Sequence, residues 1–126
     1  MKNLVASILI LFILILNCNS VFSFDFAPEV GDIAPNFQLE GVNKNIKSKS
    51  NWELSDFEGK WLVMYFYPKD FTAGCTIEAK GFSEFKKDFS KYNAEIIGIS
   101  ADNQDSHESF CSEKSINYTL LSRRNY

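Results

Sequence analysis

Apolar runs alternate with segments of helical periodicity from residue 61 onward, and this pattern predicts most of the secondary structure. The run Trp61–Tyr67 is apolar on both faces, which is typical of a strand that helices cover above and below. Pro68 ends this strand because proline cannot donate to a strand ladder. Apolar residues then recur at helical spacing over Ile77–Tyr92. The remaining predicted elements are strands at 36–39, 95–100 and 118–121, a polar surface loop at 42–51, and a helix from Asp102 or Asn103 to about Lys114.

The predicted helix at 77–92 carries a stripe of large side chains. Its members are Glu78, Phe82, Phe85, Phe89 and Tyr92, at positions i, i+4, i+7, i+11 and i+14. We interpret the aromatic members as a core face that packs onto the sheet rather than as a cofactor site. The order strand, helix, strand, helix, strand predicts an α/β fold with a parallel sheet and right-handed crossovers.

The first residues have the pattern of a secretory signal. A positively charged start precedes an apolar run, Leu4–Leu16, and small residues follow around Val21–Ser23. We therefore predict a signal peptide at 1–23, a connector at 24–28, and one domain at 29–126. The domain is expected to be exported across a membrane, into the periplasm or an equivalent compartment.

Two alternatives to cleavage of this segment remain open. The apolar run could stay in place as a membrane anchor, although it is shorter than the roughly 20 residues that a bilayer span needs. Cys18 could carry a lipid, although Asn17 stands where lipoprotein signals have a small residue.

The chain has 126 residues and a net charge of −3, and it lacks the basic stripe that nucleic-acid binding needs. We expect no nucleic-acid partner, no cofactor, and a monomer. His107 is the only histidine, and we interpret it as a solvated residue at an exposed helix start rather than as a ligand. One histidine and isolated cysteines cannot supply the ligands of a zinc site, so no metal is expected.

Cys75 is the strongest candidate for chemistry because it lies where a strand is followed by a helix. Backbone N–H groups at a helix start are unpaired and the helix dipole is positive there, so both stabilise a thiolate. Thr72 can direct its hydroxyl at the sulfur or at a substrate oxygen, and the N–H groups of Gly74 and Cys75 can receive developing negative charge. The alternative is a buried structural thiol. A Cys-x-x-Cys oxidoreductase is disfavoured because Glu78 occupies the position of the second cysteine.

Several motifs carry a family resemblance. They are Tyr65–Asp70, Thr72, Gly74–Thr76 and Glu78–Ala79 around the cysteine, and Val30–Phe37 with Leu39, Leu54–Lys60 and Gly98–Asp102 elsewhere. Together they resemble peroxiredoxins of the bacterioferritin-comigratory (PrxQ) type, over nearly all of residues 29–122. The resemblance implies a thioredoxin-like fold with a central sheet flanked by helices. It also implies that Pro68, Thr72 and Cys75 are the Pro, Thr and Cys of the peroxiredoxin motif, and that Cys75 is the peroxidatic cysteine, which becomes a sulfenic acid. The expected substrates are hydrogen peroxide and organic hydroperoxides, and the expected reductant is a thioredoxin-like protein.

The second cysteine of the mechanism does not stand at the position that is commonest in the family. Family members commonly have it five residues after the first, where this chain has Lys80. Cys111, 36 positions after Cys75, resembles the alternative placement of the resolving cysteine in this subfamily. A disulfide between the two would then require local unwinding around both cysteines. The alternative is that Cys111 packs beside Phe110 and has no chemical role.

The resemblance also implies a final helix and strand, and an active-site arginine, beyond Tyr126. Neither Arg123 nor Arg124 matches that arginine. Three hypotheses therefore stand: an exported thiol peroxidase that uses Cys75 and Cys111, a truncated and non-catalytic remnant that serves as an interaction module, and a thiol-disulfide oxidoreductase or membrane-tethered redox partner with the same fold.

Overall fold

A computed structural model of the chain describes residues 28–46 and 49–123. The predicted signal peptide at 1–23, nearly all of the predicted connector, and Cys18 lie outside the described residues. Residues 28–34 belong to a first unit, and within them the backbone N–H of Asp32 donates to the carbonyl of Glu29 at 3.1 Å. The second unit begins at Pro35.

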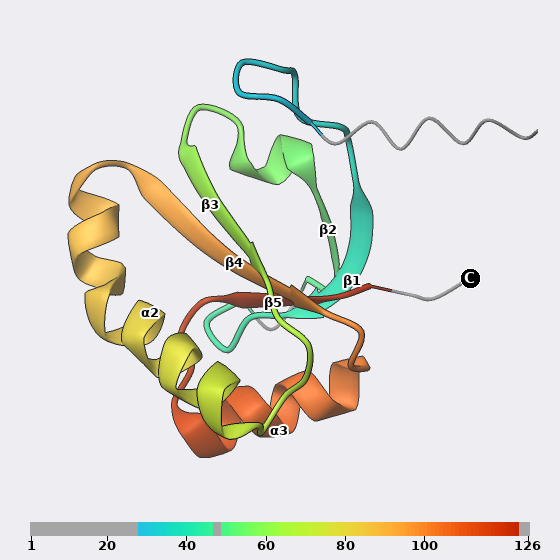
Figure 1. The fold of residues 1–126 in the computed structure, drawn as a ribbon, viewed down its shortest axis with the longest axis vertical. Coiled ribbons are helices and arrows are strands. Elements are labelled where there is room, and N and C mark those ends of the chain that lie inside the picture. Colours follow the sequence, from blue (N-terminus) through green and yellow to red (C-terminus); the bar gives the residue numbers. More distant parts are fainter. Residues whose placement is uncertain (1–27, 47–48, 124–126) are drawn as a thin grey trace, which may run out of the picture. The chain divides into compact units, whose positions relative to one another are not determined.

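The second unit is an α/β fold built on one five-stranded sheet (Figure 1). Its elements are β1 (Gln38–Val42), β2 (Asn51–Glu53), the 3-10 helix η1 (Leu54–Phe57), β3 (Trp61–Phe66), α2 (Ala73–Lys91), β4 (Ala94–Ser100), α3 (Gln104–Lys114) and β5 (Thr119–Ser122). The strand order is β2-β1-β5-β4-β3, and β3, β4 and β5 are parallel, as the alternation of strands and helices predicts. The sheet as a whole is mixed, because β1 runs antiparallel to both β5 and β2, and the order of strands and helices predicts no direction for these two strands. A short polar loop joins β1 to β2, and such a connection suits antiparallel strands.

Two apolar clusters cover the two faces of the sheet, and neighbouring residues of one strand belong to different clusters. Ile96 and Leu120 face α2 and α3, which lie on the same side of the sheet in Figure 1. Ile97 and Leu121 belong to the other cluster, with Trp52 from the β2 region. This period of two is the ordinary geometry of a strand, and it explains why β4 and β5 are apolar at nearly every position.

The strand β3 lies at the end of the described sheet, which corrects the expectation that helices cover it on both faces. Trp61 is 77% exposed and Phe66 is 69% exposed, and the residues between them are only half-buried. Apolar composition therefore does not distinguish a central strand from this edge strand.

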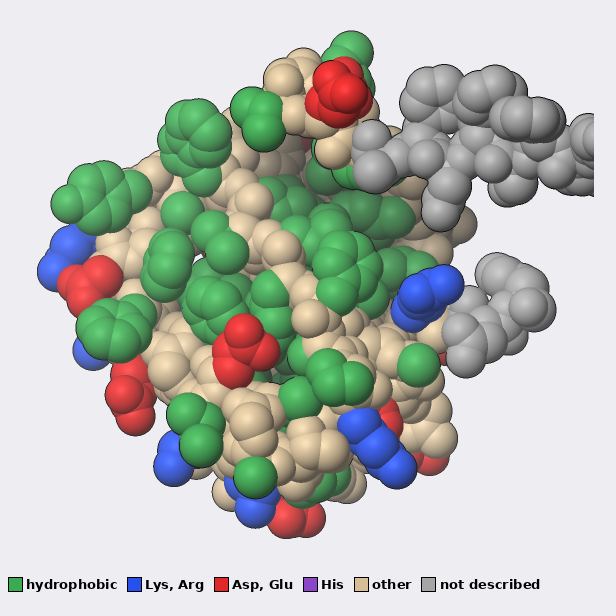
Figure 2. All heavy atoms as spheres, viewed as in Figure 1, with side chains coloured by type: hydrophobic (Ala, Val, Ile, Leu, Met, Phe, Trp, Pro, Cys, Tyr) green, Lys and Arg blue, Asp and Glu red, His purple; other side chains and the backbone are tan. Residues whose placement is uncertain are grey.

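The aromatic stripe of α2 is only partly a core face. Phe82 and Phe89 pack against the buried cluster, whereas Phe85 is 59% exposed and Tyr92 is 78% exposed. These four rings line an open groove along the helix, and Figure 2 shows hydrophobic side chains gathered over this side of the molecule. The stripe is therefore half core face and half exposed surface.

Candidate active site

The loop between β3 and α2 presents Cys75 at the start of a long helix. Tyr67 is buried directly after β3, and its backbone N–H donates to the carbonyl of Ile99 at 3.0 Å, which fixes the entry to the loop. The next residue, Pro68, is exposed. Phe71 adopts a left-handed backbone conformation with a φ of 62°, which is uncommon for a residue other than glycine and persists only where neighbouring contacts hold it. The helix α2 then begins at Ala73, so that Cys75 is its third residue.

The first turn of α2 leaves room for an anion beside the sulfur. Thr72 is the N-cap residue, but its side chain makes no capping hydrogen bond, and its hydroxyl donates instead to the carbonyl of Lys69 at 3.1 Å. The N–H groups of this turn have no partner within the helix, so they carry the positive end of its dipole. Gly74 is exposed, and apart from its two chain neighbours and the nearby helix backbone, no atom lies within 4 Å of the space that a side chain would fill there. Cys75 itself is 8% exposed and belongs to the cluster beneath the helices. A substrate oxygen could thus approach from the open side of Gly74 while the sulfur stays largely dry.

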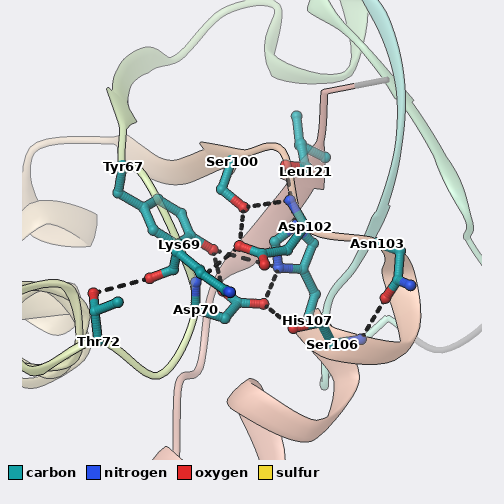
Figure 3. Close-up of polar contacts among 10 residues, drawn as sticks. All are labelled: Tyr67, Lys69, Asp70, Thr72, Ser100, Asp102, Asn103, Ser106, His107 and Leu121. Carbon is teal, nitrogen blue, oxygen red and sulfur yellow. Dashed lines mark hydrogen bonds and ion pairs between the residues drawn. The ribbon is translucent and has the colours of Figure 1, made fainter. Parts of the chain in front are cut away.

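A buried polar network holds the loop from below, and sequence reasoning missed it. We call it the Asp70 network, and it consists of Tyr67, Asp70, Ser106 and His107 (Figure 3). The hydroxyl of Tyr67 donates to Oδ1 of Asp70 at 2.7 Å. Oδ2 of Asp70 accepts from the hydroxyl of Ser106 at 2.8 Å and lies 2.8 Å from Nδ1 of His107. The carboxylate of Asp70 therefore has three partners, two of which come from α3.

The expectation that His107 is a solvated surface residue is wrong. Its side chain is fully buried, and Nε2 lies 3.3 Å from the carbonyl oxygen of Leu121 while Nδ1 faces Asp70. The helical spacing held a signal for this burial, since His107, Phe110 and Cys111 stand at i, i+3 and i+4 and therefore share one face of α3. Its position near the helix start indicates exposure, whereas the face that it shares with Phe110 and Cys111 is buried.

The environment of the network keeps Asp70 ionised. Burial raises the pKa of Asp70, but hydrogen bonds from His107, Tyr67 and Ser106 outweigh burial, and the pKa lies below its usual value. Burial and the hydrogen bond to Asp70 both raise the pKa of Tyr67, so its hydroxyl stays protonated as a donor.

A second carboxylate fixes the backbone of the same loop. Oδ2 of Asp102 accepts from the backbone N–H of Asp70 at 2.8 Å and from the hydroxyl of Ser100 at 2.7 Å. Asn103 is the N-cap of α3 and accepts from the N–H of Ser106 at 2.9 Å, so of the two predicted capping residues it is Asn103 that caps the helix. The end of β4 is thereby connected to the loop that leads to Cys75.

Cys111 lies on α3 in the same buried cluster as Cys75, and both thiols are free. Cys111 is 3% exposed, and burial, followed by the negative charge of Asp70, raises its pKa to about 12. Lys80, five residues after Cys75, is exposed on α2. The predicted pair of thiols thus faces one cluster, but Cys111 is held as a neutral thiol.

Within residues 28–46 and 49–123, no group of three or more His, Cys, Asp or Glu side chains is arranged to hold a metal ion. The helices within it are all too short or too polar to cross a bilayer.

Comparison with known proteins agrees with the geometry of the loop and the sheet. Residues 30–125 match the family model described as the AhpC/TSA family. The chain is 47% identical over 96 residues to the putative peroxiredoxin bcp of Helicobacter pylori, and the match covers 74% of this chain and 58% of that protein. It is 40% identical over 94 residues to peroxiredoxin Bcp of Bacillus subtilis, with 74% of this chain and 56% of that protein covered. The chain therefore spans somewhat more than half the length of these relatives.

Solved structures give the same result. A crystal structure of a Xylella fastidiosa PrxQ mutant superposes with a TM-score of 0.69 at 33% identity, covering 77% of this chain and 60% of that chain. Xanthomonas campestris peroxiredoxin Q superposes with a TM-score of 0.62 at 36% identity, covering 68% of this chain and 51% of that chain. The fold is therefore thioredoxin-like, and the chain belongs to the AhpC/TSA family of peroxiredoxins, in its Bcp/PrxQ type.

Proposed function

We propose that the chain acts as a thiol peroxidase that reduces hydrogen peroxide and organic hydroperoxides with Cys75. The observation that carries this proposal is the position of Cys75 at the uncapped start of α2, behind the open space at Gly74. Membership of the peroxiredoxin family supports the same reaction class.

The proposed reaction begins with attack of the Cys75 thiolate on one peroxide oxygen. The O–O bond breaks, the sulfur becomes a sulfenic acid, and the other oxygen takes up a proton and leaves as water or an alcohol. The N–H groups at the start of α2 stabilise the negative charge that develops on the oxygens. Thr72 donates to the carbonyl of Lys69 in the structure, so donation to the substrate would require rotation of its hydroxyl. Pro68 precedes this turn and restricts its backbone.

Recycling uses Cys111 in this proposal. Its thiol condenses with the sulfenic acid, a disulfide with Cys75 forms, and water leaves. A thioredoxin-like dithiol then reduces the disulfide and is itself oxidised. The position of Cys111 in the same buried cluster as Cys75 supports this pairing over an external thiol as the first partner.

The test is peroxide consumption by the purified full chain in the presence of a dithiol reductant. Wild type should consume hydrogen peroxide and an alkyl hydroperoxide, and Cys75→Ser should leave only the uncatalysed rate. Thr72→Val should lower the rate by about 10²-fold or less, because it removes a single polar contact. Cys111→Ala is the matched control, since it should still complete the first turnover. Equal rates for wild type and Cys75→Ser would contradict the proposal.

A second candidate, a non-catalytic interaction module, is favoured by one observation. Among the described residues β3 is the last strand of the sheet, and it exposes Trp61 and Phe66. Exposed apolar side chains beside such an edge suit the addition of a partner strand. If peroxide fails to consume the thiol of Cys75 in wild type, this candidate replaces the peroxidase. Reduction of a protein disulfide without peroxide would instead select a thiol-disulfide oxidoreductase.

We also propose that the domain is exported, on the strength of the signal-like pattern that ends near Ser23. Mass spectrometry of the protein recovered from cells would test this, because a mature chain that begins near Phe24 supports cleavage. A chain that retains Met1 would contradict it.

A further inference from the structure

The Asp70 network joins the loop that leads to Cys75 to the helix that carries Cys111. Tyr67 and Asp70 belong to the loop side, and Ser106 and His107 belong to the first turns of α3. Asp70 is 3% exposed and His107 is fully buried, so these hydrogen bonds form away from water, where a missing partner is costly. One turn after His107, the same helix face carries Phe110 and Cys111.

An aromatic contact supports the same junction. The ring of Phe71 meets the ring of Phe110 edge to face, with the centroids 5.1 Å apart, and the ammonium of Lys114 lies 5.7 Å from the Phe71 ring centroid. Phe71 holds the left-handed backbone conformation of the loop, and such a conformation persists only when its surroundings determine it. The loop before Cys75 and the inner face of α3 are therefore packed as one unit.

Cys111 is shielded in this arrangement, because its side chain is only 3% exposed within the cluster beneath the helices. The thiolate is the nucleophile in disulfide formation, and burial raises the pKa of this thiol, so its neutral form is favoured. The carboxylate of Asp70 contributes to this rise in the pKa, second to burial. Cys111 lies on the same helix as Ser106 and His107, so a movement of α3 that brings Cys111 toward Cys75 acts against their hydrogen bonds to Asp70.

We propose that Asp70 and His107 are positioning residues that set how fast Cys111 closes on oxidised Cys75. This inference rests on the proposed function. The sulfenic acid of Cys75 has two fates: it condenses with the thiol of Cys111, which forms the disulfide and releases water, or it reacts with a second peroxide, which forms the sulfinic acid and releases water or an alcohol. Hydrogen bonds between Asp70 and α3 slow the first reaction and so favour the second. The Asp70 network thereby determines how readily Cys75 is over-oxidised.

The test compares two serines of α3. Ser106→Ala removes one hydrogen bond to Asp70, whereas Ser112→Ala, the matched control, changes an exposed serine of the same helix. His107→Leu removes a second bond, and His107→Asn keeps a side-chain N–H that can donate to Asp70. In the full chain, rapid quenching and mass spectrometry would follow three species after hydrogen peroxide is added: the sulfenic acid of Cys75, the disulfide, and the sulfinic acid.

The ratio of the closure rate to the rate of first oxidation should rise about tenfold in Ser106→Ala and in His107→Leu, since each loses a hydrogen bond to a charged group. The sulfinic fraction should fall accordingly, and Ser112→Ala and His107→Asn should stay within about threefold of wild type. In the reduced protein, alkylation of Cys111 should accelerate in the same two variants.

Several results would overturn the inference. One is an unchanged ratio of the closure rate to the rate of first oxidation in Ser106→Ala. This variant is the mildest, so it still tests the inference if His107→Leu fails to fold. Another is a parallel fall of both rates, which would assign His107 to the stability of the loop alone. If wild type forms sulfenic acid but the ratio is the same in all variants, this inference fails and the proposed function stands. If wild type forms no sulfenic acid, both fail.

Discussion

Replacing Phe110 by alanine should destabilise the α/β unit more than most other single truncations. Phe110 is fully buried on α3, and its ring lies 5.1 Å from Phe71 and 6.5 Å from Tyr67, centroid to centroid. It therefore packs against both ends of the segment that carries Asp70.

The magnitude follows from the burial. Truncation of a buried Phe to Ala costs about 3–5 kcal/mol, because it removes apolar burial and leaves a cavity. A domain of this size has a total stability of about 5–15 kcal/mol. With a urea m-value near 1.5 kcal/mol/M, within the range of about 1–3 for small proteins, the midpoint of unfolding should fall by about 2–3 M.

Urea titration followed by circular dichroism measures this midpoint. Phe85→Ala is the matched control, because Phe85 is 59% exposed on α2 and its truncation should change stability by less than about 1 kcal/mol. A loss below about 1 kcal/mol for Phe110→Ala, or an equal loss for the two variants, would refute the assignment of Phe110 to the packed junction.

Three further predictions follow from the titratable groups and the glycines. The pKa of Asp70 in the folded state lies below 3.8, so its ionised form adds stability above that pH, and this stability is lost as the pH falls further. When melting temperatures are measured at a series of acidic pH values, they should therefore fall less steeply with pH in Asp70→Asn than in wild type. Burial raises the pKa of Cys111 from 9.0 to about 12. The protonated thiol therefore contributes its full stability below pH 9, and this contribution is lost as the pH rises toward 12. At pH 9, alkylation of Cys111 followed by mass spectrometry should be at least about 10²-fold slower in the folded than in the urea-unfolded chain. Gly98→Ala should lower the free energy of unfolding by about 1–3 kcal/mol and lower the melting temperature, because the new Cβ would lie 2.8 Å from the ring of Tyr65. Gly81 lies in open space on α2, so Gly81→Ala should raise the free energy of unfolding by about 0.5–1 kcal/mol and raise the melting temperature.

The positions of the main helices and strands could be predicted because they depend on local periodicity. The strands around Ile96 and Leu120, the helix after Cys75 and the N-cap at Asn103 all have signals within a few residues. The antiparallel pairing of β1 was not predicted, since pairing between Gly41 and Leu121 is a long-range choice that no local pattern encodes.

The candidate site divides in the same way. The placement of Cys75 at a helix start follows from the order of strand, loop and helix, which a sequence shows directly. His107 is buried against Asp70, 37 positions earlier, and the spacing of His107 with Phe110 and Cys111 signals only which helix face it shares, not this partner. A polar side chain that is buried by a distant partner is therefore the kind of functional residue that local reasoning misses.

The surroundings of the two thiols assign them different places in the proposed reaction. Cys75 stands at the positive end of a helix with open space beside Gly74, so it meets the peroxide first. Cys111 is buried in the cluster beneath the helices, and this burial, followed by the charge of Asp70, raises the pKa of its thiol. Asp70 also ties the helix of Cys111 to the loop through its bond with Ser106. A peroxidase with this arrangement begins its first step with Cys75 in place, whereas the hydrogen bonds between Asp70 and α3 oppose the movement of Cys111 in the second step. The strength of the hydrogen bonds at Asp70 then determines how long the sulfenic acid of Cys75 remains exposed to a second peroxide.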